Sequence, residues 1–325
     1  MPKISCPQPK WRPTASLENL QLRARILTEI RAFFLARDVM EVDTPLLSSA
    51  ASTDPYLDSF KTEYRGPHAP GGRHCYLPTS PEFAMKRLLA ADSGAIYQIC
   101  KAFRNGEAGR HHNPEFTLLE WYRPGFDLHA LMDEVAALIT LVLGVREIER
   151  LRYRQLFLDH VSIDPFACNI ETLKNCLEKH NVSLSGFEGG LDDWLSLVMT
   201  HIIEPRLGAV FVYDFPVSQA MLAQIRDDTQ PVAERFELYI DGVELANGFH
   251  ELTDAAEQRR RFERDLQQRE RLGLPKLPMD EMLLLGLRHG LPDCSGVALG
   301  IDRLLMLVAG AASIGDVIAF PIQRC

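Results

Sequence analysis

The sequence predicts an α+β fold built around a largely antiparallel sheet. Strand-like runs lie in the outer thirds of the chain, and helical patterns lie between them. Hairpin-type turns, rather than regular βαβ crossovers, join neighbouring strands. The 325 residues, of which 46% are hydrophobic and 24% charged, are typical of a globular protein. This length allows one large domain or two smaller ones.

Charge and composition exclude several classes of protein. Lys and Arg number 35 and Asp and Glu number 44, so the net charge of −9 provides no basic field for binding nucleic acid non-specifically. No apolar run approaches the length of a membrane span, and the first ten residues lack the apolar core of a secretion signal. Seven scattered cysteines without a C-x-x-C motif favour reduced thiols. We therefore expect a cytoplasmic protein without a membrane partner.

The N-terminal third begins with a proline-rich arm at 1–15. Apolar residues then recur every three or four positions, which predicts an amphipathic helix over 16–38. Residues 40–43 alternate like a strand, which Pro45 ends because proline has no amide hydrogen to donate. The segment Thr79-Ser-Pro-Glu82 is typical of a helix start, with hydroxyl caps, a first-turn proline and a carboxylate at the positive end.

The remaining elements follow from the same periodicities. The middle helical block, residues 127–206, has no interpretable motif, and we expect it to be packing scaffold. The expected strands are 96–103, 116–122, 210–213, 233–240, 243–249 and 294–299; the expected helices are 127–143, 169–181, 190–203, 255–272, 280–288 and 301–310; a further apolar run occupies 317–320.

The pair Asp241-Gly242 predicts a hairpin with a type I′ turn. The resulting register places Glu237 opposite Ala246, and it places Glu237 and Glu244 on one face as diagonal neighbours. Two like charges in this arrangement repel unless a cation or a raised pKa relieves them. A Mg²⁺ ion binds through one or two carboxylates plus substrate phosphates. The spacing alone leaves open a Mg²⁺ site or a solvated pair.

The strand at 116–122 places Phe116, Leu118, Glu120 and Tyr122 on one face. An aromatic ring, a carboxylate and a phenol suit the floor of a ligand site, although an exposed sheet face would carry them equally well. The preceding loop, 104–115, gathers arginine, histidine and asparagine donors that suit phosphate or carboxylate oxygens. A solvated loop is the alternative.

A third feature is the strand that runs into Gly300 and directly into a helix with Arg303 in its first turn. The helix dipole favours acidic residues at this end, so the arginine suggests an anion just outside the helix. The P-loop and Rossmann signatures are absent, so those two modes of nucleotide binding lose their main support.

Taken together and in this order, these segments resemble the three signature motifs of class II aminoacyl-tRNA synthetases. The helix with Glu41-Val-Asp-Thr-Pro45 is similar to motif 1, the stretch from Phe103-Arg104-Asn105 to Phe116 to motif 2, and Gly300-Ile-Asp302-Arg303 to motif 3. Segments 79–82, 116–122 and 244–252 resemble the lysyl branch. The resemblance covers nearly the whole chain and implies a catalytic domain over 16–325, with an antiparallel sheet flanked by helices.

Lysyl-tRNA synthetases carry an anticodon-binding domain before motif 1, whereas motif 1 begins here near residue 16. The resemblance is therefore to the stand-alone paralogues of the lysyl branch. These enzymes adenylate (R)-β-lysine and attach it to a lysine side chain of elongation factor P. The expected partners are lysine or β-lysine and elongation factor P, without tRNA. A homodimer is also expected, through motif 1 and the apolar face of residues 20–34.

The resemblance also implies roles for individual residues. Arg104 and Arg303 would be catalytic. Arg104 would contact the α-phosphate and the substrate carboxylate, and Arg303 would hold the γ-phosphate. The implied cofactors are ATP and Mg²⁺, with the metal held by Glu237 and Glu244. The remaining ATP-binding residues would be Asn105, Gly106, Asn113, Phe116 (stacked on adenine), Leu245 and Gly300; the amino-acid site would comprise Ser80, Pro81, the ammonium-binding Glu82, Glu120, Tyr122 and Glu251, and the carboxylate-binding Asn247.

The sequence departs from the family pattern at two positions. Motif 2 usually reads Arg-Asn-Glu, whereas this chain has Gly106 at the third position and Glu107 after it. Ala298 stands where lysyl synthetases have glycine, which adds a methyl group near the amino-acid site.

Strict alternation along the strand at 243–249 would place Asn247 on the opposite face from Glu244. If both side chains face the ligand, a β-bulge must lie between them, near Ala246 or Gly248.

Three other functions remain open: a truncated lysyl-tRNA synthetase-like adenylating enzyme, an asparagine-synthetase-like ligase and a catalytically inactive regulatory paralogue. The set of Glu120, Tyr122 and Glu251 disfavours an acidic substrate. The retained arginines and carboxylates disfavour an inactive paralogue. The sequence does not distinguish α-lysine from β-lysine or its stereochemistry.

Overall fold

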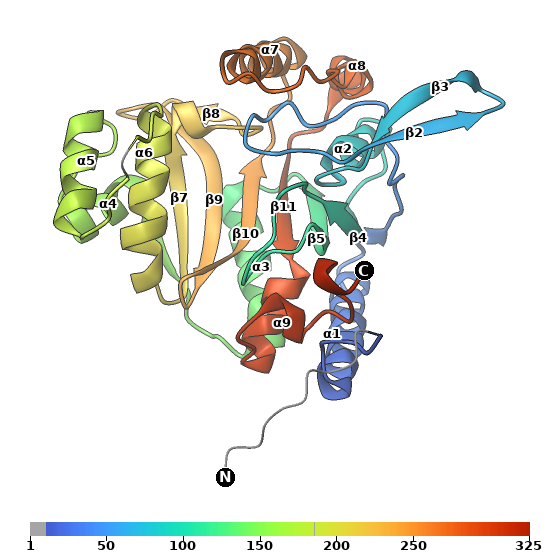
Figure 1. Cartoon of the computed structure of the whole chain (residues 1–325), viewed down its shortest axis with the longest axis horizontal. Helices are drawn as coiled ribbons and strands as arrows, with labels where there is room; N and C mark the ends of the chain where they lie inside the picture. Colours follow the sequence, from blue (N-terminus) through green and yellow to red (C-terminus); the bar gives the residue numbers. More distant parts are fainter. Residues whose placement is uncertain (1–10, 185) are drawn as a thin grey trace.

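The computed structural model describes residues 11–184 and 186–325. A mixed, largely antiparallel sheet forms the centre of the molecule, and helices surround it (Figure 1). This arrangement confirms the predicted α+β class. The predicted N-terminal arm lies mostly outside the described residues. None of the described helices is long and apolar enough to cross a bilayer, and each described cysteine is a free thiol.

The strands of the central sheet run in the order β1-β4-β5-β11-β10-β9-β7-β6, with β8 paired to β9. Only the β1–β4 and β6–β7 pairs are parallel. The strands are β1 (Met40–Glu41), β4 (Ile96–Phe103), β5 (Glu115–Pro124), β6 (Glu149–Arg152), β7 (Val210–Pro216), β8 (Ile225–Arg226), β9 (Val232–Ile240), β10 (Val243–His250) and β11 (Cys294–Gly300).

The helices fall into three groups around this sheet (Figure 1). α1 (Leu17–Leu35), α3 (Leu128–Leu143) and α9 (Ile301–Ala309) share the main hydrophobic core with one face of the sheet. α4 (Tyr153–Val161), α5 (Ile170–Lys179) and α6 (Leu191–Val198) form a second cluster beside β7. α2 (Glu82–Leu89), α7 (Ala255–Arg271) and α8 (Glu281–Gly290) form a third.

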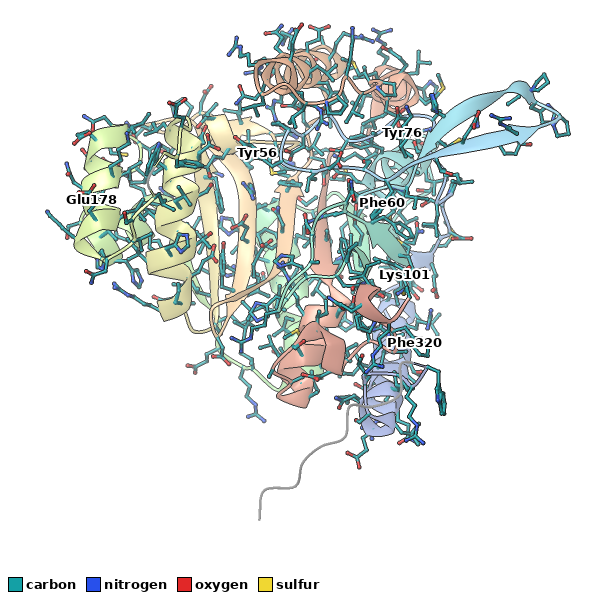
Figure 2. All side chains as sticks on the ribbon, viewed as in Figure 1. Tyr56, Phe60, Tyr76, Lys101, Glu178 and Phe320 are labelled. Atoms are coloured by element: carbon teal, nitrogen blue, oxygen red, sulfur yellow. The ribbon has the colours of Figure 1, made fainter. Side chains whose placement is uncertain are left out.

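The middle block has its own apolar core and a polar outer surface on which Glu178 is exposed (Figure 2). It is more than the predicted packing scaffold, because Leu191, Asp192 and Asp193 of α6 also line a large cavity. The sequence analysis missed β6 and α4 within this block. It also missed the hairpin formed by β2 (Lys61–Gly66) and β3 (Ala69–Tyr76). Nearly all residues of β2 are exposed on both faces, so no alternation marks the strand.

The β9–β10 hairpin determines which side chains face the site. Asp241 and Gly242 have φ values of 49° and 73°, as a type I′ turn requires. The predicted pairing of Glu237 with Ala246 is wrong. A register shift between Glu244 and Ala246 pairs Glu237 with Asn247 instead. This shift is the β-bulge predicted near Ala246, and it turns Asn247 to the same face as Glu237 and Glu244.

Candidate active site

The face of the sheet opposite the main core opens into a cavity of about 1360 Å³. A row of paired residues crosses four strands on this face: Glu120 of β5 pairs with Ala298 of β11, Ala298 with Asn247 of β10, and Asn247 with Glu237 of β9. Ala298, Asn247 and Glu237 line the cavity, whereas Glu120, Tyr122 and Glu251 are buried and are not among its lining residues. Because side chains at paired positions point to the same face, the register alone places two carboxylates and an amide on one surface.

An acidic subsite lies at one end of this row. Ser80 and Pro81, just before α2, line the cavity together with Glu82. Below them, the carboxylate of fully buried Glu120 accepts hydrogen bonds from Ser80 Oγ at 2.7 Å and from Tyr122 OH at 2.6 Å. The hydroxyl groups bind this carboxylate without neutralising it.

Lys86, which the sequence analysis missed, completes the subsite. Its ammonium lies 2.5 Å from Glu82 Oε1 and 2.6 Å from Glu251 Oε2, and the side chain is only 2% exposed. The other oxygen of Glu251, Oε1, is buried and has no hydrogen-bond partner among the described residues. The i, i+4 spacing of Glu82 and Lys86 on a predicted helix was the available signal.

Burial determines the charge state of these groups. Desolvation, reinforced by the charge of Glu82, raises the pKa of Glu120 to about 8. Desolvation also raises the pKa of Glu251 to about 7, although the Lys86 ammonium opposes this rise. Both carboxyl groups therefore gain stabilisation if a cationic ligand enters, because a nearby positive charge favours the ionised form.

Gly296 of β11 permits this close packing. A Cβ atom at this position would lie 2.3 Å from Cδ1 of Tyr122 and 2.5 Å from Oε1 of Glu251. Any side chain here would displace both groups, so the subsite requires glycine.

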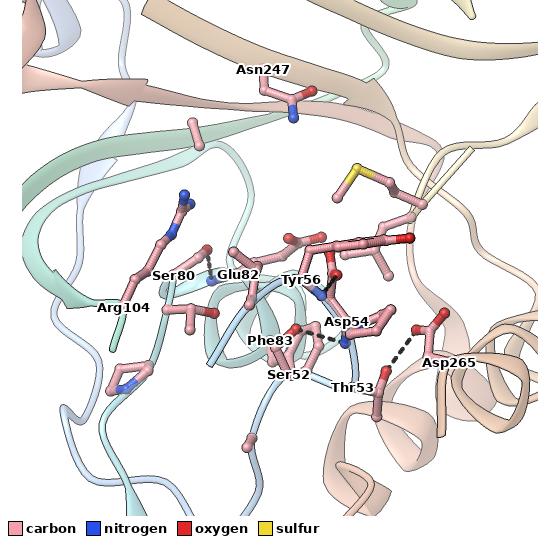
Figure 3. A pocket seen from close by; sticks show the side chains of 18 of the residues that line it. Ser52, Thr53, Asp54, Tyr56, Ser80, Glu82, Phe83, Arg104, Asn247 and Asp265 are labelled. Atoms are coloured by element: carbon pink, nitrogen blue, oxygen red, sulfur yellow. Dashed lines mark hydrogen bonds between the residues drawn. The ribbon is translucent and has the colours of Figure 1, made fainter. Parts of the chain in front are cut away.

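Arg104 provides positive charge in the same cavity. Figure 3 shows its side chain pointing into the space that Glu82 and Asn247 also face. Its guanidinium lies 5.1 Å from the ring centroid of Phe116 and 3.8 Å from Glu107 Oε1. Its buried Nε has no hydrogen-bond partner among the described residues. An unpaired buried donor is costly, and an oxygen of an anionic ligand would satisfy it.

Arg303 lies at the first turn of α9, as predicted, and also lines the cavity. Its Nη1 donates to the backbone carbonyl oxygen of Glu244 at 2.8 Å, and its Nη2 lies 2.7 Å from Nε2 of His112. Burial and the charge of Arg303 lower the pKa of His112, so the neutral imidazole accepts this hydrogen bond. The sequence analysis did not predict this contact between His112 and Arg303.

Glu237 and Glu244 lie on one face of the hairpin, as predicted, and both line the cavity. Among residues 11–184 and 186–325, no group of three or more His, Cys, Asp or Glu side chains could hold a metal ion alone. Two carboxylates completed by phosphate oxygens suit Mg²⁺. Glu244 is the more available ligand: its Oε2 has a long contact of 3.5 Å with Nη1 of Arg303, whereas Arg235 and Tyr239 make close hydrogen bonds to the carboxylate of Glu237.

The predicted nucleotide-binding residues divide into two groups. Phe116, Leu245 and Gly300 line the cavity. Asn105 and Gly106 are not among its lining residues: Asn105 Nδ2 donates instead to Asp58 Oδ2 at 2.7 Å, and Gly106 forms an exposed turn with φ of 82°. Glu107, which follows them, does line the cavity.

Asn113 lines the cavity, but both ends of its amide are occupied. Its Nδ2 donates to the carbonyl oxygen of Glu115 at 2.6 Å, and its Oδ1 accepts from the amide of Ile322 at 2.9 Å. These contacts anchor the C-terminal segment beside the cavity.

Comparisons with known proteins agree with this geometry. The family described as tRNA synthetases class II (D, K and N) matches residues 9–324. A protein of Yersinia enterocolitica named elongation factor P–(R)-β-lysine ligase is 53% identical over 318 residues, covering 97% of this chain and 98% of that protein. A Proteus mirabilis protein with the same name is 52% identical over the same shares. The chain therefore belongs to the class II tRNA synthetases and, within them, to the family of elongation factor P–(R)-β-lysine ligases.

Proposed function

We propose that the protein activates (R)-β-lysine with ATP and transfers it to a lysine side chain of elongation factor P. The observation that carries this proposal is the distribution of charge in and beneath the cavity. Glu82 lines one end of the cavity, with the buried Glu120 and Glu251 close to it, and two ammonium groups would bind there. The unpaired donor of Arg104 lies where a carboxylate and phosphate would meet. The names of the curated relatives support the same substrate and acceptor.

The chemistry needs no protein nucleophile. The substrate carboxylate attacks the α-phosphorus of ATP in line, and pyrophosphate leaves. Arg104 and Arg303 lower the barrier by holding the phosphates and offsetting their charge, and Phe116 offers a ring on which adenine stacks. Mg²⁺, bound by Glu244 and Glu237, would supply further charge neutralisation on the phosphates. The acceptor amine then attacks the acyl carbon of the mixed anhydride, which gives an amide and releases AMP.

The cavity favours this function over the alternatives. A catalytically inactive paralogue would have no need to keep Arg104, Arg303 and Glu244 around one cavity. An asparagine-synthetase-like ligase would bring an acidic substrate against the buried Glu120, at a cost in charge repulsion. We infer that the acceptor is a protein and not tRNA, because the names of the curated relatives specify elongation factor P and the net charge of −9 opposes a polyanionic acceptor. This activity would place the enzyme in the cytoplasm, with residues 16–325 as its catalytic domain.

A competition between acceptors tests this proposal. ATP, Mg²⁺ and (R)-β-lysine are offered together with equal amounts of elongation factor P and tRNA(Lys). Mass spectrometry should show one β-lysyl group added to one lysine of elongation factor P, while the tRNA stays uncharged. Efficient aminoacylation of the tRNA with the protein unmodified would instead support a truncated synthetase.

Glu244→Ala should lower ATP–pyrophosphate exchange by at least about 100-fold, because Glu237 alone, already hydrogen-bonded, cannot hold the metal between phosphates. The measurement is exchange as a function of Mg²⁺ concentration. Glu178→Ala, on the outer surface of α5, is the matched control. Wild-type exchange by the Glu244 variant would refute the metal assignment.

A homodimer is expected, but the predicted surface needs correction. The apolar face of residues 20–34 is not available, because Ile26, Ile30 and Phe34 pack into the protein's own core. Other apolar side chains near motif 1 are exposed instead, and β1 lies at an open edge of the sheet. Exposed apolar residues here include Leu17, Leu35, Met40 and Leu47.

Sedimentation should therefore show a dimer at micromolar concentration. Met40→Lys combined with Leu35→Lys should shift the equilibrium toward monomer, because it places charge on the proposed interface. A fully active wild-type monomer under these conditions would contradict the expectation.

A further inference from the structure

We propose that Lys86 is a specificity-determining residue. Its ammonium group offsets part of the negative charge of the amino-acid subsite, so that the remaining charge matches a substrate with two ammonium groups. This inference rests on the proposed function and adds to it a reason why the subsite selects such substrates. Lys86 has a positioning and charge-setting role and takes no part in the bond-forming step.

The geometry of Lys86 supports this role. Its ammonium bridges Glu82 and Glu251, at 2.5 Å and 2.6 Å, and its side chain is 2% exposed. Burying an ammonium group this completely is costly unless it is paired, and both partners belong to the substrate subsite. The carboxylates of these partners raise the pKa of Lys86 above its usual range although burial alone would lower it, so the group stays charged.

The charge of the subsite follows from its members. Glu82, Glu120 and Glu251 contribute three carboxylates, and Lys86 contributes one ammonium, so two negative charges remain when all are ionised. The two ammonium groups of β-lysine cancel this remainder. A substrate with one ammonium would leave one buried carboxylate without a counter-charge, so it should bind more weakly than a substrate with two.

The positions of the free oxygens agree with this count. Lys86 occupies one oxygen of Glu82 and one of Glu251, while Oε1 of Glu251 keeps no hydrogen-bond partner among the described residues. Glu120 accepts hydrogen bonds from the hydroxyls of Ser80 and Tyr122, and among residues 11–184 and 186–325 no ion pair neutralises it. The subsite therefore retains acceptors for incoming ammonium groups.

The role of Lys86 can be separated from simple structural support by a pair of variants. Glu251→Gln removes one negative charge and leaves Lys86 in place, so the subsite carries one negative charge. Adding Lys86→Met to this variant restores the count of two. The KM for (R)-β-lysine in ATP–pyrophosphate exchange at pH 8.5 should rise at least about tenfold in Glu251→Gln and fall again by about threefold or more in the double variant.

Substrate discrimination provides an independent readout. 3-Aminohexanoate is β-lysine without its second amine, so it carries one ammonium. The preference for β-lysine over this analogue should shrink about tenfold in Glu251→Gln and recover in the double variant. A Lys86 that only supports the fold would make the double variant equal to or weaker than the single one.

Circular dichroism and thermal unfolding show first that each variant is folded. If a Glu251 variant is not folded, Glu82→Gln and the double variant Glu82→Gln/Lys86→Met test the same charge balance, because Glu82 is the other carboxylate paired with Lys86. Lys101→Met is the control and should leave every parameter unchanged. Lys101 lies on the surface (Figure 2), where it forms an exposed ion pair with Glu115.

The outcomes are distinguishable. Recovery in the double variant supports the inference, and its absence in each folded pair overturns it while leaving the proposed function intact. Failure of the wild-type enzyme to exchange pyrophosphate with (R)-β-lysine would instead refute the proposed function.

Discussion

Replacing Arg104 with alanine should lower the rate of ATP–pyrophosphate exchange by about 10²–10³-fold, the usual cost of losing one preorganised charged donor. Arg104 is the residue whose buried Nε lacks a partner among the described residues, and its guanidinium lies beside the Phe116 ring. Adenylation concentrates negative charge at the α-phosphate in the transition state. Loss of this cation should therefore lower kcat more than it raises KM.

Arg104→Lys is the informative companion. Lysine keeps the charge but not the planar fork of donors, so its rate should lie between those of wild type and alanine. Arg65→Ala, which removes an exposed arginine of β2 paired with Glu63, is the matched control and should behave as wild type. Exchange by Arg104→Ala within about threefold of wild type would remove Arg104 from the catalytic machinery.

The second large effect concerns Glu120 and pH. Because burial raises the pKa of this carboxyl to about 8, it is mostly protonated in the free enzyme at pH 6.5 and mostly ionised at pH 8.5. A diammonium substrate needs the ionised form. The KM for (R)-β-lysine should therefore fall roughly tenfold or more between pH 6.5 and 8.5, and Glu251, with a pKa of about 7, should add to the fall at the acidic end.

Glu120→Gln should raise the KM at pH 8.5 by about 100-fold, because a substrate ammonium would lose its buried counter-charge. It should also flatten the dependence of KM on pH above about 7. Glu178→Gln, at an exposed site on α5, should leave the profile unchanged. A Glu120→Gln enzyme that keeps the wild-type slope would exclude Glu120 as the titrating group.

Thermal unfolding offers an independent check on the same carboxyl. The folded state holds a proton on Glu120 up to about pH 8, whereas an exposed glutamate loses its proton near 4.5. The folded state therefore binds more protons than the unfolded state in this window, and stability contributed by this group falls as pH rises through it. Glu120→Gln should be more stable than wild type at pH 8.5, and the difference should shrink at pH 5.

Local patterns in the sequence determined the secondary structure that carries the site. The helix start at Thr79–Glu82, the Asp241-Gly242 turn and the alternating face of β5 all depend on neighbouring residues and backbone preferences. For this reason they were predictable without knowledge of the fold. The resemblance to class II synthetases then indicated which of these local features share one cavity.

Contacts between distant segments were decided only by the tertiary structure. The ion pair of Lys86 with Glu251 joins α2 to the residue that follows β10. The hydrogen bond from Asn105 to Asp58, which turns Asn105 away from the cavity, joins two loops that are distant in the sequence. Periodicity describes one element at a time, whereas the charge balance of a buried site is a property of all the elements that meet there.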